Sequence, residues 1–280
     1  MSRPNNIVRR VFIPLGVLSI LVLSPTACLD DAPLGLNEDR EGWNLVWSDE
    51  FDGPAGQLPN PANWGFDLGT DWGNQQLEYT TDRPENVSLD GSGNLAITAR
   101  QESFQGSAFT SARITTKGKF EPQQGLIEAR IKLPSGKGLW PAFWLLGANI
   151  DTVPWPGCGE IDVMENRGQE PGIILGSLHG PGYAGSKAIT SSYFEEDVRF
   201  DAGFHTYTVE WTKNSVSWYV DGTRYRTVTP LDVPGEWVYD HPFYLILNVA
   251  VGGTFVGFPG PDTVFPQTML VDWVRVYERG

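Results

Sequence analysis

Apolar and polar residues alternate along much of the chain, which is the pattern of β-strands with one buried face. In residues 126–133 (LIEARIKL), apolar side chains alternate with charged ones. Residues 215–228 (SVSWYVDGTRYRTV) have the pattern of a hairpin with Asp221-Gly222 at its turn. Residues 243–251 (FYLILNVAV) are continuously apolar, which predicts a strand buried on both faces. No stretch of helical period competes, so the sequence predicts an all-β fold of two packed antiparallel sheets.

The first part of the chain differs in composition from the rest. Residues 1–28 combine an arginine-containing start, an apolar run over 11–23 and a small-residue exit, which is typical of a signal peptide. Residues 29–41 are polar, acidic and without periodicity, so we expect a tether. Residues 42–280 contain no second linker and no internal repeat, which favours one large domain.

Cys28 leaves two alternatives open for the mature N-terminus. It follows Thr-Ala as the cysteine of a bacterial lipoprotein does, but Pro25 stands where Leu is usual. The chain is therefore either acylated at Cys28 or cleaved nearby without lipid. In both cases we expect an exported monomer, extracellular or at the cell surface; a membrane contact is expected only in the acylated form, through its lipid.

Charge and cysteine content exclude several classes of protein. The net charge is −14 and no block of Lys and Arg occurs, so we expect no nucleic-acid partner. Two cysteines cannot build a disulfide framework. Cys158 has no histidine nearby in sequence, so we interpret it as a small buried hydrophobic residue rather than a catalytic thiol.

The segment EIDVME carries three acids within six residues. In a regular strand, Glu160 and Asp162 face one side and Glu165 faces the other. One extra residue around Val163-Met164, a β-bulge, would return Glu165 to the side of the other two acids. The two glutamates would then stand roughly 13 Å apart along the strand, and by leaning together would bring their carboxyls to roughly 5 Å. Retaining glycosidases need about 5–5.5 Å, whereas inverting ones need about 6.5–9.5 Å.

Ionising all three acids on one face would place like charges at short range, so the pKa of at least one acid is expected to rise. A protonated acid beside an ionised carboxylate is what glycosidic cleavage requires. A solvated acidic strand and a calcium loop are the plainer alternatives. Ile161, Val163 and Met164 between the acids argue against a calcium loop and indicate a core on the opposite face.

Three tryptophans lie within sixteen residues just before the acids. Aromatic faces stack on the apolar faces of sugar rings. We therefore expect Trp140 and Trp155 to bind substrate, whereas Trp144, in the apolar FWLL, fits either core or cleft.

These segments resemble glycoside hydrolase family 16. GEIDVMEN is similar to the active-site strand of that family, and WPAFWLL, SLHGPGY and PFYLILNVAVGG are similar to its laminarinase-type branch, the endo-β-1,3-glucanases. The resemblance covers residues 43–278 and implies a jelly-roll β-sandwich with a substrate cleft across its concave sheet. It also implies a catalytic domain over 42–280 that hydrolyses β-glucans such as laminarin with retention of configuration. One departure is LEYTTD, where the family more often has two aromatics before the Thr.

The resemblance assigns roles to residues. Glu160 is implied to be the nucleophile, Asp162 the assisting carboxylate and Glu165 the general acid/base, with no cofactor for catalysis. The candidates for lining the cleft are Asn74, Arg113, Trp140, Trp144, Trp155, His179 and Asn248. Plainer roles stay open for three of these residues: a strand-edge arginine, a structural histidine and a buried amide with backbone partners.

A structural calcium far from the chemistry is also implied. Its ligands would be Asp272 and backbone carbonyls near Glu50 and Gly93. The alternative for Asp272 is an ordinary salt bridge.

The motif alone does not fix the substrate. Agar- and carrageenan-cleaving relatives carry the same E-x-D-x-x-E spacing, so a galactan or a mixed-linkage β-1,3-1,4-glucan stays open beside β-1,3-glucan. A non-catalytic β-glucan-binding surface protein is the alternative from another class. That protein would need the tryptophans but not the acids.

Overall fold

The computed structural model describes residues 42–280. The predicted signal peptide (1–28), the tether (29–41) and the acylation site at Cys28 lie outside these residues, so they stay predictions. Among the described residues, no helix combines the length and the hydropathy of a membrane span.

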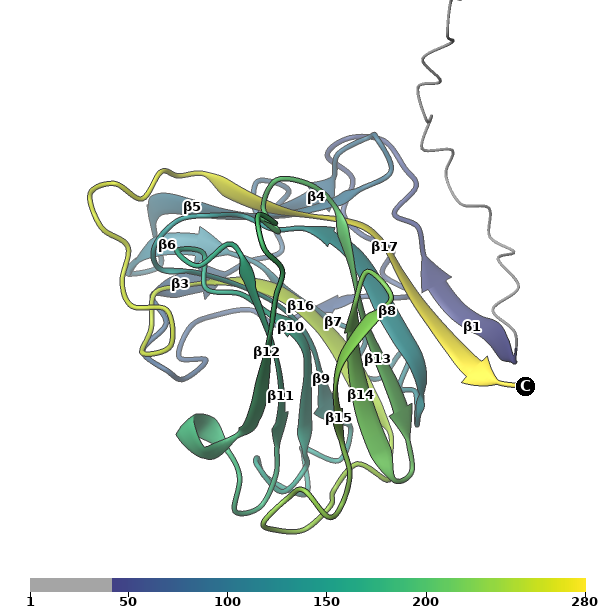
Figure 1. The fold of residues 1–280 in the computed structure, drawn as a ribbon. Helices are drawn as coiled ribbons and strands as arrows, with labels where there is room; N and C mark the ends of the chain where they lie inside the picture. The colour runs from purple at the N-terminus through teal and green to yellow at the C-terminus, as the bar shows by residue number, and fades with distance from the viewer. Residues whose placement is uncertain (1–41) are drawn as a thin grey trace, which may run out of the picture. The chain divides into compact units, whose positions relative to one another are not determined.

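Two β-sheets form the fold (Figure 1). The seven-stranded sheet consists of β2 (Gly65–Phe66), β7 (Arg113–Thr115), β9 (Leu139–Gly147), β10 (Glu160–Glu165), β11 (Ile173–His179), β12 (Ile189–Phe194) and β16 (Phe243–Val251). Its strand order is β12-β11-β10-β9-β16-β7-β2. The acidic strand β10 therefore lies between β9 and β11, with β16 one strand further away.

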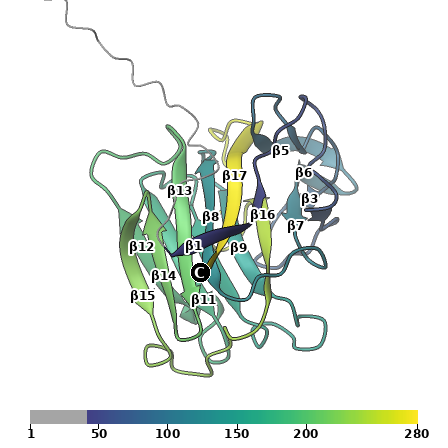
Figure 2. The ribbon, with the colours of Figure 1, turned by 90° about the vertical axis from the view of Figure 1, so that its right-hand side faces the viewer.

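The second sheet has ten strands. These are β1 (Trp43–Asp49), β3 (Glu78–Thr80), β4 (Val87–Leu89), β5 (Leu95–Phe104), β6 (Ser107–Ser111), β8 (Gly125–Lys132), β13 (His205–Thr212), β14 (Ser215–Val220), β15 (Thr223–Val228) and β17 (Gln267–Arg279). The main path is β15-β14-β13-β8-β17-β5-β6-β3, with β4 beside β5. Figure 2 shows β1 next to β17, so the first and last strands of the described part pair with each other.

The pairing and the packing confirm the predicted two-sheet antiparallel sandwich. All strand pairs of the described part are antiparallel except β3–β6, and its only helical element is the 3-10 turn η1 (Gly185–Lys187). The core lies between the sheets: Phe143 and Ile161 of one sheet pack in one cluster with Ile127 and Trp218 of the other. This packing gives β10 one face in the core and one face directed outward.

Two local predictions are also confirmed. Asp221 and Gly222 have φ values of 47° and 78°, the left-handed conformations that a type I′ hairpin turn requires at both central positions. The strand β16 is buried on both faces because a small second cluster covers its outer face, where Tyr244 and Ile246 pack with Leu146 and Cys158.

Cys158 is thus a buried hydrophobic residue, as predicted, and it forms no disulfide. Burial raises the pKa of its thiol to about 11, which keeps it protonated and unreactive.

Candidate active site

The predicted bulge is present in β10. Asp162 and Met164, two positions apart, pair with adjacent residues of β9, and the pairing with β11 shifts in the same interval. Val163 is therefore the extra residue, and it lies in the core together with Met164. Because of this shift, Glu165 joins Glu160 and Asp162 on the outer face of the sheet.

Glu165 shows its orientation through its partners. Its Oε1 accepts a hydrogen bond of 3.0 Å from Nε1 of Trp140, on β9. Its Oε2 lies 3.5 Å from Oγ of Ser177, the residue that pairs with Asp162 across the sheet. Residues paired directly across a sheet project to the same face, so Glu165 and Asp162 share that face.

Glu160 is the most exposed of the three acids, with 17% of its side chain accessible. Nε1 of Trp155 donates a hydrogen bond of 2.9 Å to its Oε2. Its Oε1 lies 3.5 Å from Nε2 of His179, which comes from the end of β11. One carboxylate oxygen therefore has a fixed donor, and the other has only this longer contact.

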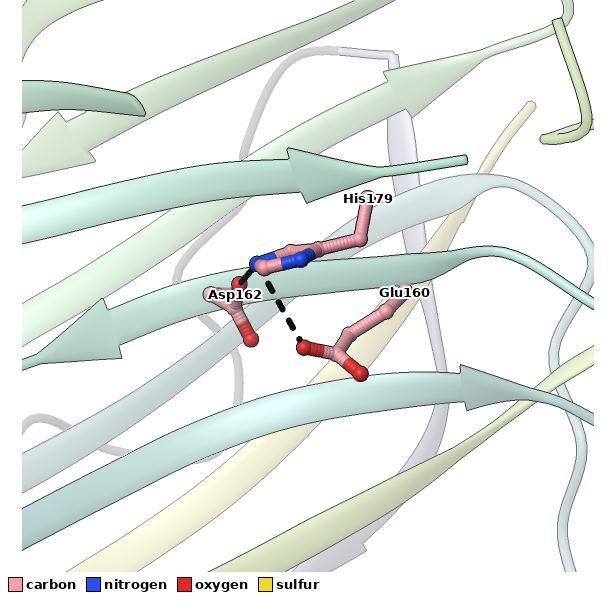
Figure 3. Close-up of side chains that lie close together, drawn as sticks. All are labelled: Glu160, Asp162 and His179. Carbon is pink, nitrogen blue, oxygen red and sulfur yellow. Dashed lines mark ion pairs between the residues drawn. The ribbon is translucent and has the colours of Figure 1, made fainter. Parts of the chain in front are cut away.

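Asp162 is nearly fully buried between these two glutamates. Its Oδ2 lies 3.1 Å from Nε2 of His179, and Figure 3 shows the imidazole beside both Asp162 and Glu160. Its backbone carbonyl accepts a hydrogen bond of 2.8 Å from Nε1 of Trp218, on the opposite sheet. That bond ties the bulge to the core, so the position of Asp162 depends on the packing of both sheets.

Burial raises the pKa of all three acids, each to about 8. For Glu160 and Glu165 the charge of Asp162 raises the pKa further, while His179 and the tryptophan N–H groups lower it. For Asp162 a hydrogen bond with Glu160 acts against burial. The acids therefore titrate as a group, and the group keeps protons near neutral pH. An acid that can donate a proton thus lies beside a carboxylate that can act as a nucleophile.

The candidate tryptophans all contribute to the outer face. Trp140 and Trp155 bind the two glutamates directly, and Trp155 is 45% exposed. For Trp144 the sequence left core and cleft open. Its Nε1 donates a hydrogen bond of 2.8 Å to Oδ1 of Asn248. Trp144 therefore lies on the outer face beside the acids and not in the core between the sheets.

Arg113 and Asn248 belong to one cluster with Trp144. Arg113 pairs with Asn248 across the sheet, and its guanidinium lies 4.7 Å from the Trp144 ring centroid. The Trp72 ring also lies against this guanidinium, with its centroid 4.8 Å away. Nε of Arg113 lies 2.9 Å from Oδ2 of Asp67. Its interactions are those of a positioned cation rather than of a free arginine at a strand edge.

Asn74 lies further from the acids. Its φ is 52°, and its carbonyl accepts a hydrogen bond of 2.8 Å from the backbone N–H of Thr254, just after β16. Within residues 42–280, the Asn74 side chain makes no hydrogen bond to any of the three acids. Its role in substrate binding stays a prediction.

Sequence reasoning missed three side chains of this face. Asp67 and Trp72 complete the surroundings of Arg113, and Phe255 packs on Trp140 with ring centroids 4.8 Å apart. Each comes from a loop far from β10 in sequence. The only signal was the tryptophan content of the chain, eleven residues, which did not indicate Trp72 in particular.

Two side chains at the predicted calcium site, Asp272 and Glu50, form ion pairs. Oδ2 of Asp272 pairs with Arg130, and the Glu50 carboxylate receives two hydrogen bonds from Arg275, at 3.0 and 2.9 Å. Calcium takes six to eight oxygen ligands. Asp272 has one oxygen left for an ion, and the other predicted ligands are backbone carbonyls near Glu50 and Gly93, which these side-chain contacts do not test. Calcium stays a prediction, and no chemistry below depends on it.

Comparisons with known proteins point in one direction. The family model described as glycosyl hydrolases family 16 matches residues 69–275. The chain is 41% identical over 249 residues to a beta-glucanase of Rhodothermus marinus, which covers 84% of this chain and 85% of that protein. Two longer relatives are spanned to only 34% and 40% of their length.

Solved structures resemble the domain closely. The endo-beta-1,3-glucanase of Pyrococcus furiosus has a TM-score of 0.81 at 47% identity, covering 85% of this chain and 95% of that one. The laminarinase catalytic domain of Thermotoga maritima has a TM-score of 0.80 at 46% identity, covering 86% and 100%. This similarity confirms the predicted jelly-roll sandwich.

Proposed function

The chain belongs to family 16 of the glycosyl hydrolases, and we propose that it is a retaining endo-glycosidase that cleaves β-1,3-glucosidic linkages in β-glucans such as laminarin. The observation that carries this function is the bulge in β10, which sets Glu160, Asp162 and Glu165 on one face. A tryptophan N–H then holds each of the two glutamates. The 1,3-linkage is supported by the endo-1,3-glucanases and laminarinases among the similar structures.

The first step is an attack by Glu160 on the anomeric carbon. Glu165, protonated, donates its proton to the glycosidic oxygen as the bond to the leaving sugar breaks. Burial and the charge of Asp162 raise the pKa of Glu165, which suits a proton donor at neutral pH. The product is an ester between Glu160 and the sugar.

The second step releases the sugar. Glu165, now ionised, takes a proton from a water molecule, and the resulting hydroxide attacks the anomeric carbon of the ester. Two inversions give net retention of configuration. Both steps need only proton transfer and one covalent ester, so the reaction requires no cofactor.

The hydrogen bonds to Glu165 and Glu160 favour one role for each carboxyl oxygen. Oε1 of Glu165 accepts the 3.0 Å bond from Trp140, whereas Oε2 has only the longer 3.5 Å contact with Ser177, so we place the transferable proton on Oε2. Oε2 of Glu160 accepts the Trp155 N–H, which leaves Oε1 for the attack. Each tryptophan thus fixes the orientation of one reacting carboxyl.

The sugar chain is expected to lie on the outer face of the seven-stranded sheet. Trp155 offers an exposed ring next to Glu160, and the cluster of Arg113, Trp72 and Trp144 offers stacking surfaces and a cation on the side of β7. Asn248 would supply a hydrogen bond to a sugar hydroxyl. The protein would meet this substrate outside the cell, after export directed by residues 1–28.

A reducing-sugar assay on four polysaccharides tests the function. Laminarin, barley β-glucan, agarose and κ-carrageenan should be compared, with Glu160→Ser as the inactive control. New reducing ends from laminarin at the highest rate are the expected result. A mixed-linkage enzyme would prefer barley β-glucan, a galactanase would cleave agarose or κ-carrageenan, and a non-catalytic glucan-binding protein would release no ends.

A further inference from the structure

The imidazole of His179 is held in one protonation form by the loop that follows it. The backbone N–H of Gly185 donates a hydrogen bond of 3.1 Å to Nδ1. A ring nitrogen that accepts a hydrogen bond carries no proton, so the single proton of the neutral ring lies on Nε2. Nε2 is the nitrogen that lies 3.1 Å from Oδ2 of Asp162 and 3.5 Å from Oε1 of Glu160 (Figure 3).

The loop is anchored by two hydrogen bonds, one at His179 itself and one four residues later. Tyr183 is fully buried, and its hydroxyl donates a hydrogen bond of 2.7 Å to the carbonyl of Glu236. The hydroxyl of Tyr239 donates a hydrogen bond of 2.9 Å to the carbonyl of His179. Gly185 has a φ of 59°, a conformation that favours glycine, and its N–H is directed at the ring. The tautomer is therefore a property of the folded loop.

A metal site is the rival explanation for the same atoms. Glu160, Asp162 and His179 offer three ligand atoms within 4.8 Å of one another. A metal would need a lone pair on Nε2, which requires the proton to move to Nδ1. Nδ1–H would then face the N–H of Gly185, donor against donor. The surroundings of the ring therefore favour a hydrogen-bond donor over a metal ligand.

Asp162 needs such a donor. Its Oδ2 is buried and makes no aligned hydrogen bond within the described residues, and Nε2 of His179 lies 3.1 Å away. An unpartnered buried carboxylate oxygen is costly, and the N–H of His179, 3.1 Å away, is placed to remove much of that cost once the ring turns into line with it.

We propose that His179 is a positioning residue of the hydrolytic site: a neutral, fixed Nε2–H donor, set by Gly185, that holds Asp162 and Glu160 for the displacement. This role rests on the function proposed above. Before the attack, the N–H is shared between the two carboxylates and stabilises negative charge on Glu160. Once Glu160 has become an ester, the Asp162 carboxyl is the remaining acceptor and keeps the N–H. His179 transfers no proton in either step.

NMR spectroscopy tests the tautomer on the unmodified protein. The chain has three histidines, His179, His205 and His241, so long-range ¹⁵N–¹H correlations of the rings are readily assigned with a His179→Gln sample. At a pH where the ring is neutral, the His179 signals should show the Nε2–H form. An Nδ1–H form would overturn the assignment, because Gly185 could then not donate to that nitrogen.

A matched pair of variants tests the consequence for catalysis. In His179→Gln, the amide nitrogen reaches the place of Nε2 and can donate to the acids. In His179→Asn, the amide reaches only the place of Nδ1 and cannot. We expect kcat on laminarin to stay within about fivefold of the wild type for Gln and to fall roughly 100-fold for Asn, with KM changed less than about threefold in both.

Three results would overturn this role. These are equal losses of kcat for Gln and Asn, no loss for Asn, and a change confined to KM, which would indicate a substrate contact instead. Circular dichroism and Tm establish that both variants are folded, and the NMR measurement needs neither. If the wild type fails to cleave any of the four polysaccharides, the proposed function fails, while the tautomer is still read from the spectrum.

Discussion

The indole N–H of Trp155 donates a hydrogen bond of 2.9 Å to Oε2 of Glu160, five residues further along the chain. The same ring is 45% exposed, whereas only 17% of the Glu160 side chain is accessible. One residue thus orients the proposed nucleophile and also presents an apolar face where a sugar ring would stack. Mutation can separate these two roles, because phenylalanine keeps an aromatic face and loses the N–H.

Trp155→Phe should change the pH profile of hydrolysis. Burial raises the pKa of Glu160, and the Trp155 N–H acts against it. Without the N–H the pKa of Glu160 rises further, and Glu160 must be ionised to attack. The acidic limb of kcat/KM should therefore move to higher pH, and kcat should fall roughly tenfold. Trp43→Phe, on β1 of the other sheet, is the control with an unchanged profile. A limb that stays in place or moves to lower pH would contradict the role of this bond.

Azide should separate the roles of Glu160 and Glu165. Glu160→Ala and Glu165→Ala are each expected to lower kcat by roughly 10⁴-fold or more. With an activated aryl glucoside, azide attacks the sugar directly in Glu160→Ala and gives a glycosyl azide of inverted configuration. In Glu165→Ala the ester on Glu160 still forms, so azide gives the retained configuration. The anomer is read by NMR. The opposite pattern would exchange the two roles.

Deletion of Val163 should leave an active enzyme. Asp162, Met164 and Glu165 would keep their partners on β9, because Val163 is the residue that has none there. The strand would become regular, with its acids at alternate positions and still on one face. We expect a loss of about 1–3 kcal/mol in the free energy of unfolding, from the lost buried side chain. Hydrolysis should stay well above that of Glu160→Ser.

Deletion of Ile161 is the matched control for that experiment. It removes one residue between Glu160 and Asp162, so those two acids would face opposite sides of the sheet. This variant should be inactive. A folded but inactive Val163 deletion, measured by circular dichroism and by the laminarin assay, would show that the bulge does more than set the phase of the acids.

Asp162→Asn should stabilise the fold more at alkaline than at acidic pH. Burial raises the pKa of Asp162 from its ordinary value of 3.8 to about 8 in the folded chain. Between these values the folded chain keeps a proton that the unfolded chain has lost, so this acid's contribution to stability falls as pH rises. Asparagine has no proton to lose. The difference in unfolding free energy between variant and wild type should thus shift in favour of the variant by about 1–3 kcal/mol from pH 5 to pH 8.

Urea unfolding at the two pH values measures this difference. Asp52→Asn, at an exposed loop position, is the control, and its difference from the wild type should be the same at both pH values. A variant whose advantage shrinks as pH rises would contradict the raised pKa of Asp162.

Local patterns predicted the parts of this protein that depend on neighbouring residues. The bulge at Val163 was predictable because strand side chains alternate with a period of two, and Glu165 would otherwise face the core with the apolar residues around it. The turn at Asp221-Gly222 was predictable because both positions need positive φ. The burial of Cys158 was predictable because a free cysteine is usually a small buried residue, and no histidine nearby in sequence indicated a catalytic thiol.

Other features had no local signal. The sequence could not assign Trp144 to core or cleft, because β9 is apolar on both faces. The structure shows that Trp144 packs against the second cluster, with Leu146 and Tyr244, on the outer face of the sheet. Asp67 and Trp72 were missed because they meet Arg113 through a loop. The proposed donor form of His179 could not be predicted from sequence. It depends on the backbone N–H of Gly185, and every residue except proline carries such a group.

The sequence by itself determined the class of fold, the phase of the three acids and the chemistry that they allow, since these follow from the alternation along single strands. The tertiary structure decided which groups surround each acid. Trp140 reaches Glu165 and His179 reaches Asp162 because of the strand order β11-β10-β9 and its register. Those partners set the orientation and protonation of the acids. They depend on contacts between segments far apart in the chain, and alternation within a strand carries no information on such contacts.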